Sequence, residues 1–301
     1  MLVTKVSVRN MMAVVALAGS LSQISLAKKP AKFDVIDFPG AVSTITTGVN
    51  LTSDIVGIYE GADHVAHGFV LSKNTFQTID VPWTAARTVA FGINQSGDVV
   101  GGSNISNTPG AAGDGFLLSN GVFTKISCPN ETGFGTYAYG INKYGQIVGT
   151  CLTVTGTGTQ VHGFLYENGA FTLFDYPGVG LTNTYAYGIN DAGDVVGTYG
   201  DSTGKHAFVW QQGLFTQIDG PGATATSAHG ISNAGDIVGE YSVAGVEYGY
   251  LLSGGVMATL SSTAGTIITG YGIDPNGKLI VGTMTTGSGT SLQIHGYLLA
   301  P

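Results

Sequence analysis

The amino-acid sequence predicts an all-β fold made of one strand module repeated around a ring. The chain of 301 residues is 43% apolar and 10% charged and contains 48 glycines, which is typical of short strands joined by tight turns. A segment of the type Tyr-Gly-Ile-Asn, a polar turn and Asp-Val-Val-Gly occurs six times, at intervals of 42 to 48 residues. Regular repeats of this length are typical of four-stranded blades, so we expect a six-bladed β-propeller. The six copies start at Thr47, Phe91, Tyr139, Tyr187, His229 and Tyr271.

Each repeat is predicted to contain two antiparallel hairpins, which supply four strands. In the first hairpin, residues 190–193 (Asn-Asp-Ala-Gly) form a turn whose glycine adopts positive φ without steric strain. In the second hairpin, Asn168-Gly169 is a strong signal for a two-residue type I′ turn. Both turns are short, so they fix the register of the strands that they join.

The register of the second hairpin places a histidine opposite an aspartate in several repeats. Because this feature recurs around the ring, we interpret the pairs as structural cross-strand contacts, not as a metal site or a catalytic site. Where the histidine is absent the acid is absent as well, as expected for residues in contact. The predicted pairs are His67 with Asp80, His162 with Asp175, His206 with Asp219, and His295 with Asp37.

The fourth pair depends on how the two ends of the repeat array meet. The last repeat lacks its outermost strand, whereas an extra strand over residues 33–37 precedes the first repeat. We therefore expect the N-terminal strand to complete the last blade and close the ring, which would hide sheet edges that an open array exposes. Residues 28–301 would then form one propeller domain. An open β-solenoid is the alternative, and the complementary ends argue against it.

Residues 1–27 have the features of a signal peptide. Lys5 and Arg9 precede an apolar run, and a small-residue cleavage site ends at Ala27. The run is too short to span a bilayer, so we expect no membrane span after cleavage and a protein secreted to the periplasm, the cell surface or the medium of a bacterium. The mature chain has a net charge of about −10 and no basic cluster, which argues against nucleic acid as a partner.

The chain contains two cysteines, Cys128 and Cys151. An even number of cysteines in an exported protein is consistent with a disulfide, and two buried free thiols are the alternative.

The repeat resembles a known bacterial family. The combination of Gly-Ile-Asn, Gly-Asp-Val-Val-Gly and His-Ala-Phe or His-Gly-Phe is similar to the HAF-type extracellular repeat, and residues 206–208 spell His-Ala-Phe. The resemblance covers the mature chain and implies an extracellular repeat protein. The family has no defined activity that could be transferred, and the second and fifth repeats lack the histidine.

The sequence contains no motif for a metal, a cofactor or a catalytic nucleophile. The turn acids lack the distal bidentate acid of a calcium loop, and we expect neither a metal nor another cofactor. Function is instead expected on the rim that holds the loops of variable length. His229 departs from the repeat, and we interpret it as a packed polar aromatic. The candidate ligand-binding residues on or near the rim are Trp83, Arg87, His64, Asp63, Glu60 and Phe134.

We therefore expect a monomeric, non-catalytic binding or interaction module for a glycan, a small molecule or a surface protein. Two alternatives stay open: a propeller-type lyase or hydrolase with a cluster such as His64, His229 and Arg87, and a structural component of the cell surface or matrix. An enzyme predicts at least two non-repeating titratable groups near the mouth of the central channel. A binding module predicts an exposed aromatic patch there without such groups.

Overall fold

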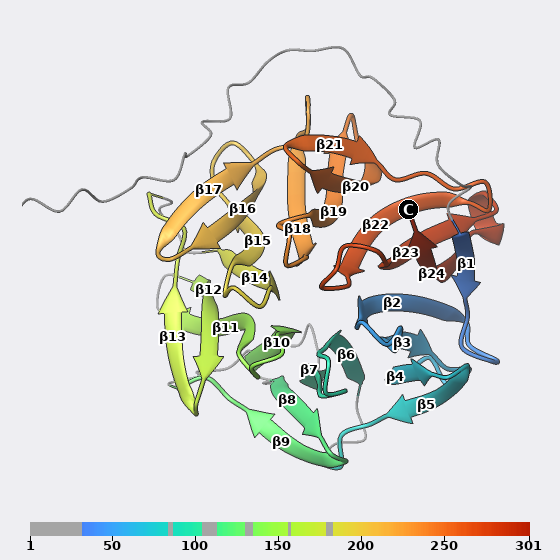
Figure 1. The fold of residues 1–301 in the computed structure, drawn as a ribbon, viewed down its shortest axis with the longest axis horizontal. Coiled ribbons are helices and arrows are strands. Elements are labelled where there is room, and N and C mark those ends of the chain that lie inside the picture. Colours follow the sequence, from blue (N-terminus) through green and yellow to red (C-terminus); the bar gives the residue numbers. More distant parts are fainter. Residues whose placement is uncertain (1–31, 84–86, 104–112, 130–134, 156–157, 179–182) are drawn as a thin grey trace, which may run out of the picture.

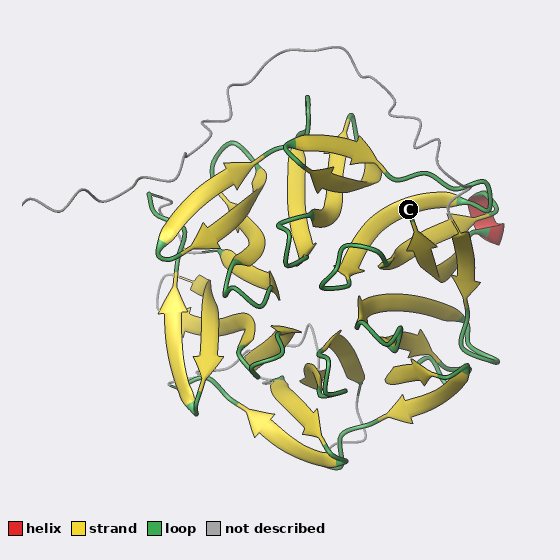
Figure 2. Ribbon diagram, in the orientation of Figure 1, coloured by secondary structure: helices red, strands yellow, loops and turns green. Residues whose placement is uncertain are grey.

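A computed structural model describes residues 32–301 apart from residues 84–86, 104–112, 130–134, 156–157 and 179–182. The described chain forms antiparallel strands and a short 3-10 helix at Gly289–Ser291 (Figure 2). Among the described residues, no helix has the length and apolar character needed to cross a bilayer. The predicted signal peptide over residues 1–27 and the candidate residue Phe134 lie outside the described residues.

The strands form consecutive groups of four, which we number as units one to six. Unit one contains β2 (Ser43–Val49), β3 (Ile55–Glu60), β4 (Ala66–Ser72) and β5 (Thr75–Ile79). Unit two contains β6 (Thr88–Ile93), β7 (Val99–Ser103), β8 (Asp114–Ser119) and β9 (Val122–Ile126). Unit three contains β10 (Gly135–Ile141), β11 (Ile147–Thr155), β12 (Gly158–Glu167) and β13 (Ala170–Phe174).

The remaining units follow the same plan. Unit four contains β14 (Thr184–Ile189), β15 (Val195–Gly200), β16 (Lys205–Gln211) and β17 (Leu214–Ile218). Unit five contains β18 (Ala225–Ile231), β19 (Ile237–Val243), β20 (Val246–Ser253) and β21 (Val256–Thr259). Unit six contains β22 (Thr266–Ile273), β23 (Ile280–Thr286), β24 (Gln293–Ala300) and, from the other end of the chain, β1 (Lys32–Ile36).

The units are arranged around a common centre. Figure 1 shows β2, β6, β10, β14, β18 and β22 innermost, with the later strands of each unit farther out. Units one, two, three and six are separate four-stranded sheets, whereas units four and five share an eight-stranded sheet through one parallel pair, Lys205 with Ala225. This arrangement is an all-β propeller fold.

The N-terminal strand pairs with the C-terminal strand of the described chain. β1 runs antiparallel to β24, with Phe33 opposite Leu299 and Val35 opposite Tyr297. Asp37, directly after β1, accepts a hydrogen bond of 2.9 Å from Nδ1 of His295. The strand predicted at residues 33–37 therefore lies at Lys32–Ile36 and occupies the outer position of unit six.

The turns have the conformations expected from their residues. The side-chain oxygen of Asn190 accepts hydrogen bonds from the backbone N–H groups of Ala192 and Asp194, at 3.0 and 2.9 Å, which makes an Asx turn. In the second hairpin of unit three, Asn168 and Gly169 both have positive φ, 52° and 81°, as a type I′ turn requires. The pairing of Tyr166 with Phe171 confirms the register that this turn predicts.

The predicted cross-strand contacts also occur in units one, three and four. Nδ1 of the histidine lies 3.0 Å from a carboxylate oxygen of the aspartate in each pair: His67 and Asp80, His162 and Asp175, His206 and Asp219. Unit two lacks the histidine, and Lys125 forms an ion pair of 2.8 Å with Asp114 there. All these contacts connect the two outer strands of a unit.

Small residues allow neighbouring units to pack closely. A Cβ atom added at Gly188 of β14 would lie 2.5 Å from the carbonyl oxygen of His229 in unit five. The same position in each unit is a glycine, because the innermost strands approach their neighbours backbone to backbone. Between these strands and the outer strands, one aromatic side chain of each unit is completely buried, which forms the core: Phe69, Phe116, Phe164, Phe208, Tyr250 and Tyr297.

A disulfide joins unit two to unit three. Cys128 follows β9, and Cys151 lies in β11, and both side chains are buried. Of the two alternatives left open by the sequence, the structure has the bonded one.

Candidate functional site

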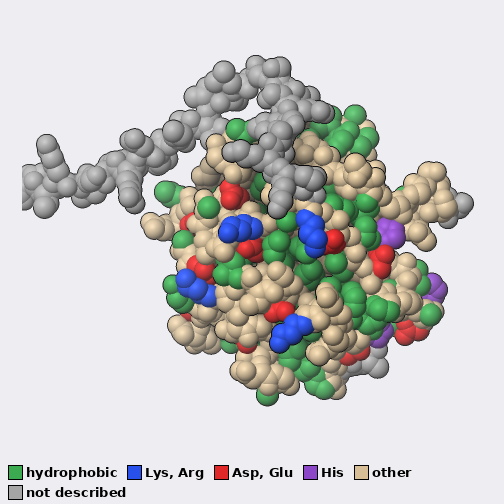
Figure 3. All heavy atoms as spheres, turned by 45° about the vertical axis from the view of Figure 1, so that its right-hand side comes forward, with side chains coloured by type: hydrophobic (Ala, Val, Ile, Leu, Met, Phe, Trp, Pro, Cys, Tyr) green, Lys and Arg blue, Asp and Glu red, His purple; other side chains and the backbone are tan. Residues whose placement is uncertain are grey.

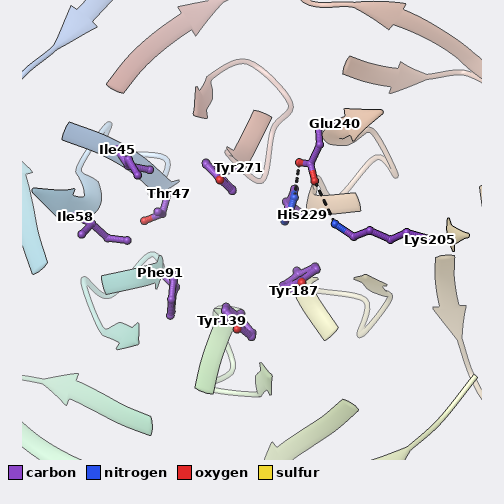
Figure 4. A pocket seen from close by; sticks show the side chains of 10 residues that line it. All are labelled: Ile45, Thr47, Ile58, Phe91, Tyr139, Tyr187, Lys205, His229, Glu240 and Tyr271. Atoms are coloured by element: carbon purple, nitrogen blue, oxygen red, sulfur yellow. Dashed lines mark hydrogen bonds and ion pairs between the residues drawn. The ribbon is translucent and has the colours of Figure 1, made fainter. Parts of the chain in front are cut away.

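A cavity of about 350 Å³ lies at the centre of the molecule (Figure 4). Ile45 near the start of β2, Ile58 near the end of β3, and Lys205 at the start of β16 contribute to its wall. These positions adjoin the connections of variable length, so the cavity lies towards the rim on which function was expected. Its lining residues are Ile45, Thr47, Ile58, Phe91, Tyr139, Tyr187, Lys205, His229, Glu240 and Tyr271.

Aromatic side chains form most of the inner ring of this cavity. Each innermost strand contributes the residue just before its glycine, and five of the six are aromatic. Adjacent ring centroids lie 4.7 to 5.0 Å apart, from Phe91 through Tyr139, Tyr187 and His229 to Tyr271. The sixth position is Thr47. Burial raises the pKa values of Tyr139 and Tyr187, so their hydroxyl groups stay neutral.

Unit five places an acid and a base against each other in this ring. Nε2 of His229 on β18 lies 2.6 Å from Oε2 of Glu240 on β19. Lys205 from the neighbouring unit four brings its Nζ to 3.7 Å from Oε1 of Glu240. The side chains of His229 and Glu240 are only 12% and 17% exposed. Figure 4 shows the three side chains converging on one side of the cavity.

Glu240 is a departure from the repeat in the same way as His229. The strand register pairs Glu240 with Ser227, and the corresponding pairs in units three and four put a threonine in place of the glutamate, Thr150 and Thr198. Unit one has Ile58 there. The two unusual residues of unit five therefore face the same point of the cavity, which their separate positions in the sequence do not reveal.

The environment of Glu240 holds it in the ionised form. Burial alone would raise the pKa of this carboxyl, but the charge and hydrogen bond of His229, the charge of Lys205 and a hydrogen bond from Ser227 outweigh it and lower the pKa to about 2. Because the ionised carboxylate is an acceptor, Nε2 of His229 donates the proton in their hydrogen bond. Among the described residues, Nδ1 of His229 has no protein partner. In its neutral form, a histidine oriented in this way by a carboxylate can accept a proton or a hydrogen bond at Nδ1 from a bound molecule, and in its charged form it can donate one there.

The rim residues predicted from the sequence lie elsewhere. His64 and Glu60 form an exposed pair, with Nδ1 of His64 at 2.7 Å from the glutamate, and Asp63 lies 3.8 Å from Nε2 of His67. Arg87 is exposed. None of the described candidate residues of the rim lines the central cavity.

Trp83 packs into the protein instead of standing free on the rim. Its indole N–H donates a hydrogen bond of 3.3 Å to Ser103, and its ring meets Phe123 edge-on at a centroid distance of 6.0 Å. Lys125 lies over the same ring, 5.2 Å from its centroid. Trp83 is therefore half-buried between units one and two, whereas Arg87 is exposed.

The cavity defines no metal centre. Within the described part of the chain, no group of three His, Cys, Asp or Glu side chains is close enough to hold a metal ion.

The fold and the central cavity place the chain in the class of β-propeller proteins. No family model matches this sequence, and no curated protein matches it. Solved structures are similar in fold, including the selenomethionine-substituted virginiamycin B lyase from Staphylococcus aureus, with 12% identity, a TM-score of 0.52 and coverage of 90% of this chain and 100% of that chain.

Two further propellers resemble this chain in the same way. The β-propeller domain of the trilobed protease from Pyrococcus furiosus has 9% identity and a TM-score of 0.50, with coverage of 86% of this chain and 94% of that one. The acylaminoacyl peptidase from Pyrococcus horikoshii has 13% identity and a TM-score of 0.54, with coverage of 87% of this chain and 44% of that one. At these identities the likeness shows the fold alone.

Proposed function

We propose that the protein is an exported bacterial binding module that takes a small organic molecule into its central cavity. The features of a signal peptide, the acidic charge and the resemblance to HAF-type repeats support export to the periplasm, the cell surface or the medium. On the face drawn in Figure 3, Lys and Arg side chains are interspersed with Asp and Glu and do not gather into a basic patch, which supports a partner other than nucleic acid.

The propeller in this proposal has six blades, one for each unit, and is closed at units six and one. The pairing of β1 with β24 supports closure. A Cβ atom added at Gly272 of β22 would lie 2.7 Å from the carbonyl oxygen of Thr47 in unit one, which is the contact that the other units make with their neighbours. A closed ring gives the central cavity a fixed circumference, so its residues are pre-organised for a ligand.

The observation that carries the proposal is the single charged corner in an otherwise apolar and aromatic cavity. Ligand sites are typically concave and apolar with a few convergent polar groups. Here Ile45, Ile58 and Phe91 lie on one side, and Glu240 with its two basic neighbours lies on the other (Figure 4). Desolvating such groups is costly for a purely structural role, and unlike the His–Asp pairs this combination occurs once among the described residues.

The proposal is tested by filling the cavity. Ile58→Trp places an indole in the cavity, and Ile294→Trp on the surface of β24 is the matched control. Ligand-observed NMR with indole, 3-phenylpropan-1-ol, glucose and N-acetylglucosamine should detect binding to the natural protein and to the control but not to Ile58→Trp. Equal binding to all three proteins would refute a ligand site in the cavity.

A propeller-type lyase or hydrolase is the second candidate, and the His229–Glu240 contact favours it. Two non-repeating titratable groups do converge in the channel, as expected for an enzyme. Lyases that act by proton abstraction use such an oriented histidine as general base. The two functions differ in the fate of the ligand: NMR spectra of a bound probe stay unchanged during incubation with a binding module, whereas an enzyme produces new signals that His229→Gln abolishes.

The variable rim is a separate proposed surface for a glycan or a surface protein. Asp63 and His64 are exposed on the connection between β3 and β4, Glu60 is half-buried at the end of β3, and Arg87 is exposed before β6. A purely structural role in the cell surface or matrix predicts binding at neither place. A glycan array with the natural protein and with Arg87→Ala distinguishes rim binding from cavity binding, since Arg87 does not line the cavity.

A further inference from the structure

The polar groups of the cavity differ in how fully they are already paired. Oε2 of Glu240 accepts a hydrogen bond of 2.6 Å from His229, and Oε1 lies 3.7 Å from the ammonium group of Lys205. Both oxygens of the acid therefore already face a basic group of the protein. In contrast, Nζ of Lys205 is 3.7 Å from Glu240, and 48% of its side chain is exposed. An ammonium group has three donors, and this contact uses at most one of them.

The charge balance of the cavity consequently favours one sign of ligand. A cation near Glu240 would lie beside the positive charge of Lys205, which repels it, and Oε2 of the acid already accepts a hydrogen bond from His229. An anion would meet the free donors of Lys205 at the edge of the cavity, and charge-assisted hydrogen bonds of this kind are the strong ones.

The opposite wall of the cavity determines which kind of ligand body fits beside the charged group. Ile45, Ile58 and Phe91 offer hydrocarbon surface, and Tyr139 beside Phe91 is neutral. Figure 4 shows these side chains across the cavity from Lys205. The volume of about 350 Å³ fits a compact molecule.

We infer that the ligand is a small amphiphilic anion, a monocarboxylate with an aromatic or alicyclic body, whose carboxylate binds Lys205 while its body lies against Ile45, Ile58 and Phe91. This inference rests on the proposed function of the cavity and adds the chemical class of its ligand. Lys205 is the residue that selects for the negative charge.

The test compares three probes of similar size: 3-phenylpropionate, 3-phenylpropan-1-ol and 3-phenylpropan-1-amine. Dissociation constants from ligand-observed NMR at low ionic strength should show the acid binding about 10-fold or more tightly than the alcohol, with the amine weakest. Lys205→Met should abolish the preference for the acid and leave binding of the alcohol unchanged. Lys205→Arg should keep the preference, because it keeps the charge.

Lys278→Met is the matched control, because Lys278 lies in the turn between β22 and β23 at the other end of the strands. It should leave all three constants unchanged. Equal binding of acid and alcohol, or tighter binding of the amine, would overturn the inference and leave the proposed cavity function standing. If none of the three probes binds the natural protein better than it binds Ile58→Trp, the inference and the proposed function fail together.

Discussion

The hydroxyl group of Thr46 donates a hydrogen bond of 2.8 Å to the carbonyl oxygen of Gly282, which is 236 positions away in the sequence. The same hydroxyl accepts hydrogen bonds from the backbone N–H groups of Gly282 and Tyr297, at 3.1 and 3.2 Å. Units two to five have alanine at this position: Ala90, Ala138, Ala186 and Ala228. A completely buried hydroxyl thus connects unit one to β23 and β24 of unit six, which lie at the other end of the described chain.

Replacing Thr46 by valine should therefore destabilise the protein by about 1 to 3 kcal/mol, because the backbone groups of Gly282 and Tyr297 lose a buried partner. The measurement is the free energy of unfolding in urea. Thr198→Val is the matched control, since the buried hydroxyl of Thr198 has no hydrogen-bond partner among the described residues and its loss should be close to neutral. An equal effect of the two substitutions would show that the hydrogen bonds of Thr46 do not stabilise the contact.

Glu240 should make the stability of the protein sensitive to acid. Its pKa is about 2 in the folded protein and near the ordinary value of 4.5 in the unfolded chain. A depressed pKa contributes stability above pH 4.5, and this contribution is lost as the pH falls towards 2. The natural protein should therefore lose about 3 kcal/mol more than Glu240→Gln over this range. Urea unfolding at several pH values measures the difference, and Glu247→Gln, at an exposed glutamate, should behave like the natural protein.

The glycine of the innermost strand should tolerate no side chain. Gly188→Ala puts a methyl group 2.5 Å from the carbonyl oxygen of His229, and either unit four or unit five has to move. We expect a loss of about 1 to 3 kcal/mol in the free energy of unfolding. At Gly200 an added Cβ has no neighbour nearer than 4.0 Å, so Gly200→Ala should be nearly neutral. If Gly188→Ala changes the free energy of unfolding as little as Gly200→Ala does, units four and five do not approach each other as closely as described.

The disulfide makes two separate predictions. Alkylation without reductant should leave the mass of the purified protein unchanged, whereas two alkylated cysteines would contradict the bond between Cys128 and Cys151. Removing the bond with a double substitution to alanine should destabilise the protein by about 3 kcal/mol, because the bond closes a loop with a sequence separation of 23 residues. Thermal unfolding of the natural protein with and without reductant checks the second prediction.

Trp83 and Arg87 should respond differently to replacement by alanine. Trp83→Ala removes the contacts with Phe123, Lys125 and Ser103 and should cost about 2 kcal/mol or more in stability. Arg87→Ala alters an exposed side chain and should change stability by less than about 0.5 kcal/mol. Urea unfolding of both variants tests this assignment. A neutral effect of Trp83→Ala would instead support an exposed tryptophan on the rim.

Much of the fold follows from the sequence because its signals are local and repeated. Asn168-Gly169 sets a turn, the turn sets the register, and the register brings His162 to Asp175. The position of β1 could be predicted as well, because an unmatched strand at each end of the repeats has one complementary place to pair.

The candidate site could not be predicted in the same way. His229 stands out as a departure from the repeat, but its interpretation as a packed aromatic omits the contact with Glu240. The acid follows a glycine in a strand that otherwise looks ordinary, and only the pairing of Ser227 with Glu240 brings it to the histidine. The packing of Trp83 could not be predicted either, because the composition of a connection does not tell whether its aromatic side chain is exposed or packs against a neighbouring unit.

The pairing of β1 with β24 has a consequence for the order in which the strands pair during folding. β2, β3 and every later strand find an antiparallel partner soon after they are synthesised, but β1 waits until β24 exists, and Asp37 and His295 are 258 positions apart. Contacts at such a separation form late, because a long loop has to be closed first. Among the described strands, β1 is thus the last to gain its partner, so interrupting translation before β24 would leave β1 unpaired beside units one to five.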